Sequence, residues 1–185
     1  MSKLGTRLIK AAKEARAATR ARPLGPRFVV LRAERASAAD FVSFWAARYD
    51  YPDYDVYKGN IGLLTRGALL NLFEWKNGRA LSEAKKRSVE QNYLDRLGYV
   101  RELGQIDGRG FLNAFPTGGA IWRTFWLHCC HHLRHPIFDQ HVYRAMIFLQ
   151  EGDRDELERY SDPEKIDLYL DRYSPFFGQF ADLNV

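Results

Sequence analysis

The chain has 185 residues, of which 46% are hydrophobic and 14% aromatic, with a net charge of +5. This is enough apolar material for one compact domain, and it excludes wholesale disorder. No apolar run reaches the roughly 18 residues of a membrane span, and the basic N-terminus lacks the apolar stretch of a secretory signal. The two cysteines, Cys129 and Cys130, are adjacent, which excludes a disulfide framework and a four-cysteine iron–sulfur cluster. We therefore predict a cytoplasmic protein without membrane association.

The positive charge is concentrated at the N-terminus. Residues 1–27 contain eight basic residues and one acidic residue, a net charge of +7. Apolar residues at helical spacing predict a helix over residues 3–20, and the Pro- and Gly-rich stretch 22–27 predicts a linker. We thus divide the chain into a basic N-terminal helix with its linker, residues 1–27, and a body, residues 28–185. The basic arm suits a polyanion such as DNA, or it is simply a solvated helix.

The body is predicted to be mainly α. Residues 28–31 suit a short strand or an extended lead-in, and residues 50–59, rich in Asp, Tyr and Pro, predict a loop. Helical patterns separated by turns cover residues 37–49, 61–76, 82–103, 111–115, 120–132, 139–149 and 162–177. This succession predicts an orthogonal helical bundle and not a sheet protein.

The stretch Pro116–Leu149 carries the chemical information. It reads as a Gly-rich hairpin, a helix, a short break, Asp139 and a second helix. A Gly-rich turn that enters a helix exposes backbone N–H groups, which bind phosphate. Asp139 stands where the second helix begins, and the helix dipole there favours an ionised carboxylate. Beside a cleft, such a carboxylate stabilises a developing positive charge or polarises a nucleophile. Asp is also a common N-cap, which is the plainer interpretation.

The order of hairpin, helix and the segment Asp139-Gln140-His141-Val142-Tyr143-Arg144 resembles the helix-hairpin-helix base-excision DNA glycosylases, the endonuclease III and adenine-glycosylase superfamily. The resemblance implies a helix-hairpin-helix element with Asp139 as the catalytic carboxylate. It also implies that the target nucleotide flips out of the duplex and passes through an oxocarbenium-like state as its base leaves. Members of the family that also cleave the strand carry a lysine just after the hairpin. Residues 120–124 contain none, so the resemblance implies a monofunctional enzyme that uses water and leaves an abasic site.

The resemblance also assigns binding roles. The backbone N–H groups of Gly118, Gly119 and Ala120 would hold a DNA phosphate, directly or through a monovalent cation, and no other cofactor is expected. Two further sets of residues are predicted, one to contact DNA and one to line the base pocket. They are Arg123, His141 and Arg144 for DNA, and Trp122, Trp126 and Tyr54 for the pocket.

Several of these residues have a structural alternative. Arg144 could pair with an acid such as Asp139 or Asp171 instead of a phosphate. His141 could hydrogen-bond nearby backbone, and aromatic residues at helical spacing are usually core. These alternatives stay open at the level of the sequence.

Two other kinds of chemistry receive less support. The histidines and cysteines of residues 128–135 include i,i+4 histidine pairs whose spacing suits zinc. The pairs point to different faces of the helix, however, so we expect no metal. A remote lysine, such as Lys58 or Lys76, could serve as the amine of a strand-cleaving enzyme, but the sequence gives neither residue positional support.

The sequence leaves the function itself with several alternatives. The excised base could be a host lesion, which implies DNA repair, or a modified base of invading DNA, which implies antiviral defence. The chain could instead be a non-catalytic helix-hairpin-helix DNA-binding protein or a DNA-binding regulator. The enzyme hypothesis predicts Asp139 in a cleft that faces the hairpin, whereas the binding-protein hypothesis predicts a capping Asp139 without an open pocket. The excised base, the strand preference and the oligomeric state follow from no pattern in the sequence.

Overall fold

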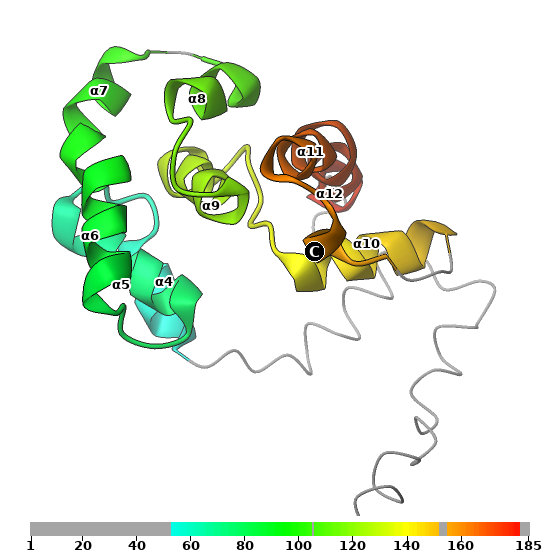
Figure 1. The fold of residues 1–185 in the computed structure, drawn as a ribbon, viewed down its shortest axis with the longest axis horizontal. Helices are drawn as coiled ribbons and strands as arrows, with labels where there is room; N and C mark the ends of the chain where they lie inside the picture. The colour runs from blue at the N-terminus through cyan, green and yellow to red at the C-terminus, as the bar shows by residue number, and fades with distance from the viewer. Residues whose placement is uncertain (1–52, 105, 152–154, 182–185) are drawn as a thin grey trace, which may run out of the picture. The chain divides into compact units, whose positions relative to one another are not determined.

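A computed structural model of the chain describes residues 53–104, 106–151 and 155–181. All regular secondary structure in these ranges is helical and none of it is strand (Figure 1), which confirms the prediction of a mainly α protein. The basic N-terminal helix and linker, the extended lead-in at residues 28–31 and the helix predicted over residues 37–49 lie outside the described residues. Within the described ranges, no helix combines the length and the apolar character needed to span a membrane.

The described elements follow one another with short connections. The α-helices are α4 (Tyr54–Asn60), α5 (Arg66–Asn77), α6 (Glu83–Asn92), α7 (Leu97–Glu102), α8 (Gly108–Ala114), α9 (Ala120–His131), α10 (Gln140–Glu151), α11 (Asp162–Asp167) and α12 (Ser174–Ala181). Short 3-10 turns lie at Leu94–Arg96 and Leu157–Arg159, and a π-helical segment, Leu168–Tyr173, joins α11 to α12.

Several of the predicted elements differ from the structure; among them, the helix predicted over residues 111–115 begins earlier, at Gly108. The segment over residues 50–59 was predicted to be a loop, but α4 begins at Tyr54 within it. The helix predicted over residues 82–103 is interrupted after α6, because Tyr93 leaves helical geometry (φ −129°, ψ −61°) and is buried in the core. The gain from burying a large aromatic side chain outweighs the loss of helix continuity at this point.

The start of α5 is also later than the periodicity predicts. Gly62 has a φ of +82°, a conformation that interrupts a helix, and Thr65 then caps the new helix by accepting a hydrogen bond from the Ala68 N–H. At its other end α5 stops at Gly78, which adopts a left-handed conformation with φ +70°. These two signals fix α5, and with it the position of Lys76 in its last turn.

The core is built around α9 and is strongly aromatic. Phe73 of α5 lies within 5.3–5.5 Å, centroid to centroid, of the rings of Tyr93, Trp122 and Phe125. Trp126 also contacts this cluster and is fully buried. Because α5, α9 and the C-cap of α6 all contribute rings to it, the cluster fixes how these three helices pack.

A second aromatic cluster holds the start of α10. Phe138 is fully buried, and its ring lies 5.2 Å from those of both Tyr169 and Tyr173 in the π-helical segment. The Tyr169 hydroxyl donates to the carbonyl of Pro136 at 3.1 Å. The backbone just before Asp139 is therefore held by the buried Phe138 ring and by the hydrogen bond to the Pro136 carbonyl. These two contacts limit the positions that the Asp139 carboxylate can adopt.

Candidate functional site

The hairpin before α9 requires glycine at Gly118. Gly118 and Gly119 have φ values of +98° and +77°, in the region that favours glycine. A Cβ on Gly118 would lie 2.1 Å from the Tyr93 hydroxyl oxygen, so the position also lacks space for a side chain. The same hydroxyl donates to the Thr117 carbonyl at 3.3 Å. The turn is thus held against the end of α6, and α9 begins directly after Gly119.

Arg123, predicted to contact DNA, lies in the first turns of α9 and points back toward α8. Its Nε donates to the Phe115 carbonyl and its Nη2 to the Leu112 carbonyl, both at 2.7 Å. These carbonyls belong to the last turn of α8 and its C-cap, which have no intrahelical partners of their own. Arg123 thus connects the two helices that flank the hairpin.

The two carboxylate oxygens of Asp139 have different hydrogen-bond partners. Oδ1 accepts hydrogen bonds from the backbone N–H groups of His141 at 2.8 Å and Val142 at 3.2 Å, which is N-cap geometry. Oδ2 accepts a hydrogen bond from Lys76 Nζ at 2.7 Å. The Lys76 side chain is 10% exposed and that of Asp139 is 29% exposed. The capping interpretation of Asp139 is therefore correct, and the second oxygen is paired with Lys76.

The surroundings of Asp139 favour its charged form. Burial raises the pKa of the carboxyl, but the positive charge and hydrogen bond of Lys76 lower it, as do the N–H groups of Val142 and His141. The net result is a pKa below the ordinary value of 3.8. Asp139 is consequently an anion at neutral pH, as its place at the start of α10 predicts.

A cavity of about 310 Å³ opens beside the Asp139–Lys76 pair. It is contributed by four parts of the chain: the end of α5, the start of α9, the start of α10 and the stretch from Leu157 into α11. The lining residues are Lys76, Ile121, Asp139, Gln140, His141, Leu157, Glu158 and Lys165. Ile121 lies in the first turn of α9, directly after the hairpin, and the hairpin residues 116–119 themselves are not among the lining residues. Its volume is at the lower end of the range for small-molecule sites, about 300 to 1,000 Å³.

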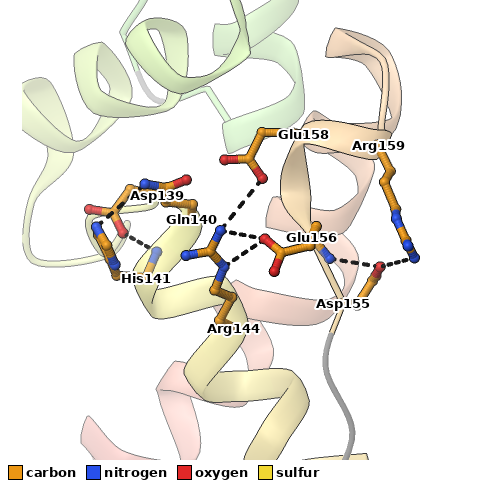
Figure 2. A network of polar contacts seen from close by, with 8 residues as sticks. All are labelled: Asp139, Gln140, His141, Arg144, Asp155, Glu156, Glu158 and Arg159. Atoms are coloured by element: carbon orange, nitrogen blue, oxygen red, sulfur yellow. Dashed lines mark hydrogen bonds and ion pairs between the residues drawn. The ribbon is translucent and has the colours of Figure 1, made fainter. Parts of the chain in front are cut away.

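Of the other residues predicted to bind DNA, His141 is exposed and lines this cavity. Arg144 lies one turn further along α10 and forms ion pairs with two glutamates. Its Nε donates to Glu156 Oε2 at 2.8 Å, its Nη2 contacts the same oxygen, and Glu158 lies 3.9 Å away (Figure 2). The alternative that Arg144 pairs with a carboxylate is therefore the one seen in the structure, with Glu156 as the main partner.

The three aromatic residues predicted for the base pocket are not among the lining residues of this cavity. Trp126 is fully buried in the core, and Trp122 is half-buried with its ring 5.5 Å from Phe73. Tyr54 is 55% exposed on α4 and stacks on Tyr57. The two tryptophans thus pack as core residues, and none of the residues that line the cavity beside Asp139 is aromatic apart from the imidazole of His141.

In the cluster of histidines and cysteines, His128 and Cys129 are core residues. His128 is buried, with hydrogen-bond contacts to the Tyr57 hydroxyl at 2.9 Å and to the His135 carbonyl at 2.6 Å. Burial raises the pKa of the Cys129 thiol well above its ordinary value, so this thiol is protonated. Among the described residues, no group of three or more His, Cys, Asp or Glu side chains is placed to hold a metal ion.

Lys76, Glu158 and Lys165 line the cavity beside Asp139; Glu158 and Lys165 were not predicted as site residues, and Lys76 was named only as one of two remote lysines without positional support. Lys76 lies 63 residues before Asp139 in the chain, and the local pattern around it indicates only the end of a surface helix. Its place at the Asp139 carboxylate results from the packing of α5 against α9 through the aromatic core. The sequence contains no local signal for this contact.

Comparison of the chain with protein-family models, with curated proteins and with solved structures gave no match.

Proposed function

We propose that this protein is a DNA glycosylase that hydrolyses the bond between a damaged or modified base and its sugar. The observation that carries the proposal is the ionised Asp139 carboxylate, fixed by its capping bonds, in the wall of a cavity that is also lined by the first turn of α9, directly after a Gly-rich hairpin. In this proposal α8, the hairpin and α9 act as the helix-hairpin-helix element of the helical bundle. The proposal rests on the sequence resemblance and on this geometry together.

The hairpin supplies the contact to the DNA backbone in this proposal. Among the described residues, the structure gives the N–H groups of Gly118, Gly119 and Ala120 no hydrogen-bond acceptor, and they stand at the start of α9, where a helix favours an anion. A carboxylate, that of Asp162, lies beside the turn. The hairpin therefore positions a phosphate by backbone contacts, and the nearby acid limits how closely that phosphate approaches.

Asp139 supplies the chemistry. As the bond between C1′ and the base nitrogen lengthens, its electron pair leaves with the base and positive charge develops on the sugar. The Asp139 anion stabilises that charge and orients a water molecule for attack at C1′. Because Oδ1 is committed to the helix N–H groups, the oxygen that faces the reacting atoms in this proposal is Oδ2, which also accepts the hydrogen bond from Lys76.

The decisive variant is Asp139→Asn, because asparagine is as good an N-cap as aspartate, while the change removes the negative charge and with it the ion pair to Lys76. Purified wild-type protein and the variant are incubated with DNA duplexes that carry a panel of damaged and hypermodified bases, then treated with alkali to cut abasic sites. We expect alkali-dependent cleavage by the wild type on at least one duplex, and a loss of at least about 100-fold in the variant. The duplex that reacts distinguishes a repair substrate from a modified foreign base.

Glu158→Gln is the matched control, since it removes a carboxylate from the same cavity that does not cap a helix. We expect it to retain most of the activity. Absence of cleavage on every duplex, with salt-sensitive DNA binding unchanged in Asp139→Asn, would instead support the non-catalytic DNA-binding protein. The cavity argues against that alternative, because a protein that only caps a helix with Asp139 has no need of an open pocket there.

A further inference from the structure

A second cavity, of about 710 Å³, is lined by α4 with its N-cap, by the second half of α5 and by the turn that follows α5. It shares no lining residue with the cavity beside Asp139, and the proposed release of a base involves none of its residues. Its volume lies within the range for small-molecule sites, about 300 to 1,000 Å³. Its charged and amide side chains are those of Asp53, Asn60, Asn71, Glu74 and Arg79.

The two amides of this cavity donate their hydrogen bonds to the protein itself. Asn60 Nδ2 donates to the Val56 carbonyl at 2.7 Å, and Asn71 Nδ2 donates to Asn60 Oδ1 at 3.1 Å. This chain of bonds fixes which end of each amide is the nitrogen. It leaves Asn71 Oδ1 as an acceptor, to which the structure gives no donor among the described residues.

Two carboxylates of the cavity also lack a protein partner. Glu74 is half-buried on α5, three residues after Asn71, and residues at this spacing lie on the same face of a helix. Among the described residues, the side chains of Glu74 and Asp53 have no hydrogen bond and no ion pair. A half-buried carboxylate normally has such a partner, because its removal from water costs free energy. Glu74 and Asn71 Oδ1 thus provide neighbouring acceptors in the wall of the cavity.

The charges of the cavity favour a cation over an anion. Arg79 is the single basic residue of the lining, against the two acids Asp53 and Glu74. It is exposed, and within the described part of the chain it forms no ion pair with either carboxylate. A ligand that suits this wall is therefore positively charged and rich in hydrogen-bond donors, whereas an anion would meet two carboxylates.

We propose that this cavity binds a guanidinium group, either that of a small guanidino compound or that of an arginine side chain in a peptide. A guanidinium is planar and permanently charged, and it carries five N–H donors in a fixed fork. It donates two parallel bonds to the Glu74 carboxylate and a further bond to Asn71 Oδ1. An ammonium has a compact charge and lacks this fork. Val56 and Trp75 in the same wall suit the carbon chain that carries the guanidinium.

Isothermal titration calorimetry of the full-length protein, without DNA, tests the proposal with two guanidinium probes. Agmatine represents a small guanidino compound, and a glycine–arginine–glycine peptide blocked at both ends represents an arginine in a protein. Putrescine and the corresponding lysine peptide replace the guanidinium by an ammonium. We expect saturable binding of at least one guanidinium probe and at least about tenfold weaker binding of its ammonium counterpart. The guanidinium probe that binds more tightly identifies the source of the group.

Two variants of the cavity should change the affinity in opposite directions. Glu74→Gln should weaken binding at least about tenfold, because it removes the charge that pairs with the guanidinium. Arg79→Gln should strengthen binding, because it removes a positive charge that repels the ligand. Glu102→Gln is the matched control, since it removes the same charge from α7, outside the lining, and it should leave the affinity unchanged. Because Glu74 has no partner among the described residues, a thermal melt of Glu74→Gln should match that of the wild type.

Three outcomes would overturn the proposal. The first is the absence of saturable binding by both guanidinium probes, and the second is equal affinity for the guanidinium and ammonium compounds. The third is weaker binding in Arg79→Gln with no change in Glu74→Gln, which is the pattern of an anion site. Because the titrations contain no DNA, their result does not depend on whether the protein is a glycosylase.

Discussion

The buried His128 links acid stability to the packing around the site in a way that can be measured. Its Nδ1 lies 2.6 Å from the His135 carbonyl and its Nε2 lies 2.9 Å from the Tyr57 hydroxyl. Burial raises the pKa of Tyr57 to about 12, so this hydroxyl keeps its proton and donates it to Nε2. The hydrogen-bond network therefore assigns a neutral ring with its proton on Nδ1. A second proton on the ring would remove the bond from Tyr57.

The pKa of His128 is correspondingly low. Burial lowers it from 6.5 to about 4; the bond to the His135 carbonyl opposes this change, and the charges of His132 and Lys76 reinforce it. The unfolded chain binds more protons than the folded one between these two values, so this contribution to stability is complete above about pH 6.5 and is lost as the pH falls toward 4. The full loss amounts to about 3 kcal/mol, of which about 2 kcal/mol has gone at about pH 5.

Urea denaturation of the wild type and of His128→Gln across this pH range isolates the contribution. The wild type also carries His131 and His135, whose pKa values burial lowers, so the measured quantity is the difference between the two proteins. We expect His128→Gln to be less stable at neutral pH but to lose less stability on acidification. Tyr57→Phe is the matched control: without the hydroxyl, Nε2 takes up a proton more readily and the acid loss becomes smaller. Equal pH dependence in wild type and His128→Gln would refute the reasoning.

Two further predictions concern the hairpin. Gly118→Ala should destabilise the protein by about 2 kcal/mol or more, from backbone strain and the contact with the Tyr93 hydroxyl; chemical denaturation measures this, and addition of Tyr93→Phe should restore part of the loss, whereas no recovery would show that strain alone is responsible. Arg123→Ala should lower stability by about 2 to 4 kcal/mol, because two carbonyls lose a charged donor. Arg123→Lys should recover little of it, since a lysine does not offer two donors in one plane; full recovery in a thermal melt would contradict this account.

The parts of the fold that could be predicted from the sequence are those governed by local signals. The helix after the hairpin and the helix after Asp139 begin where glycine and an N-cap residue predict, because these residues act on the backbone next to them. The break after α6 was missed because it depends on the burial of Tyr93 against rings from α5 and α9. Periodicity alone does not show that a residue with helical neighbours gains more from leaving the helix.

The candidate site also contains residues that the local sequence predicts and residues that only the tertiary packing brings there. Asp139 was identified from its own neighbourhood, since a carboxylate at a helix start is visible in the sequence. Lys76 and Glu158 reach it from other elements, and the contacts that bring them there are made by side chains distant in the chain. Arg144 illustrates the converse: its motif indicates a phosphate contact, but the segment over residues 155–159 places Glu156 against it (Figure 2).

The capping and the chemical interpretations of Asp139 support each other. An N-cap fixes a carboxylate through one oxygen, and an ionised carboxylate that stabilises a cation must be fixed if it is to act without reorganising. In this chain the capping bonds hold Oδ1, while Oδ2 faces Lys76 and the cavity. A helix start that is anchored by Phe138 and capped by Asp139 thus presents one carboxylate oxygen in a defined direction.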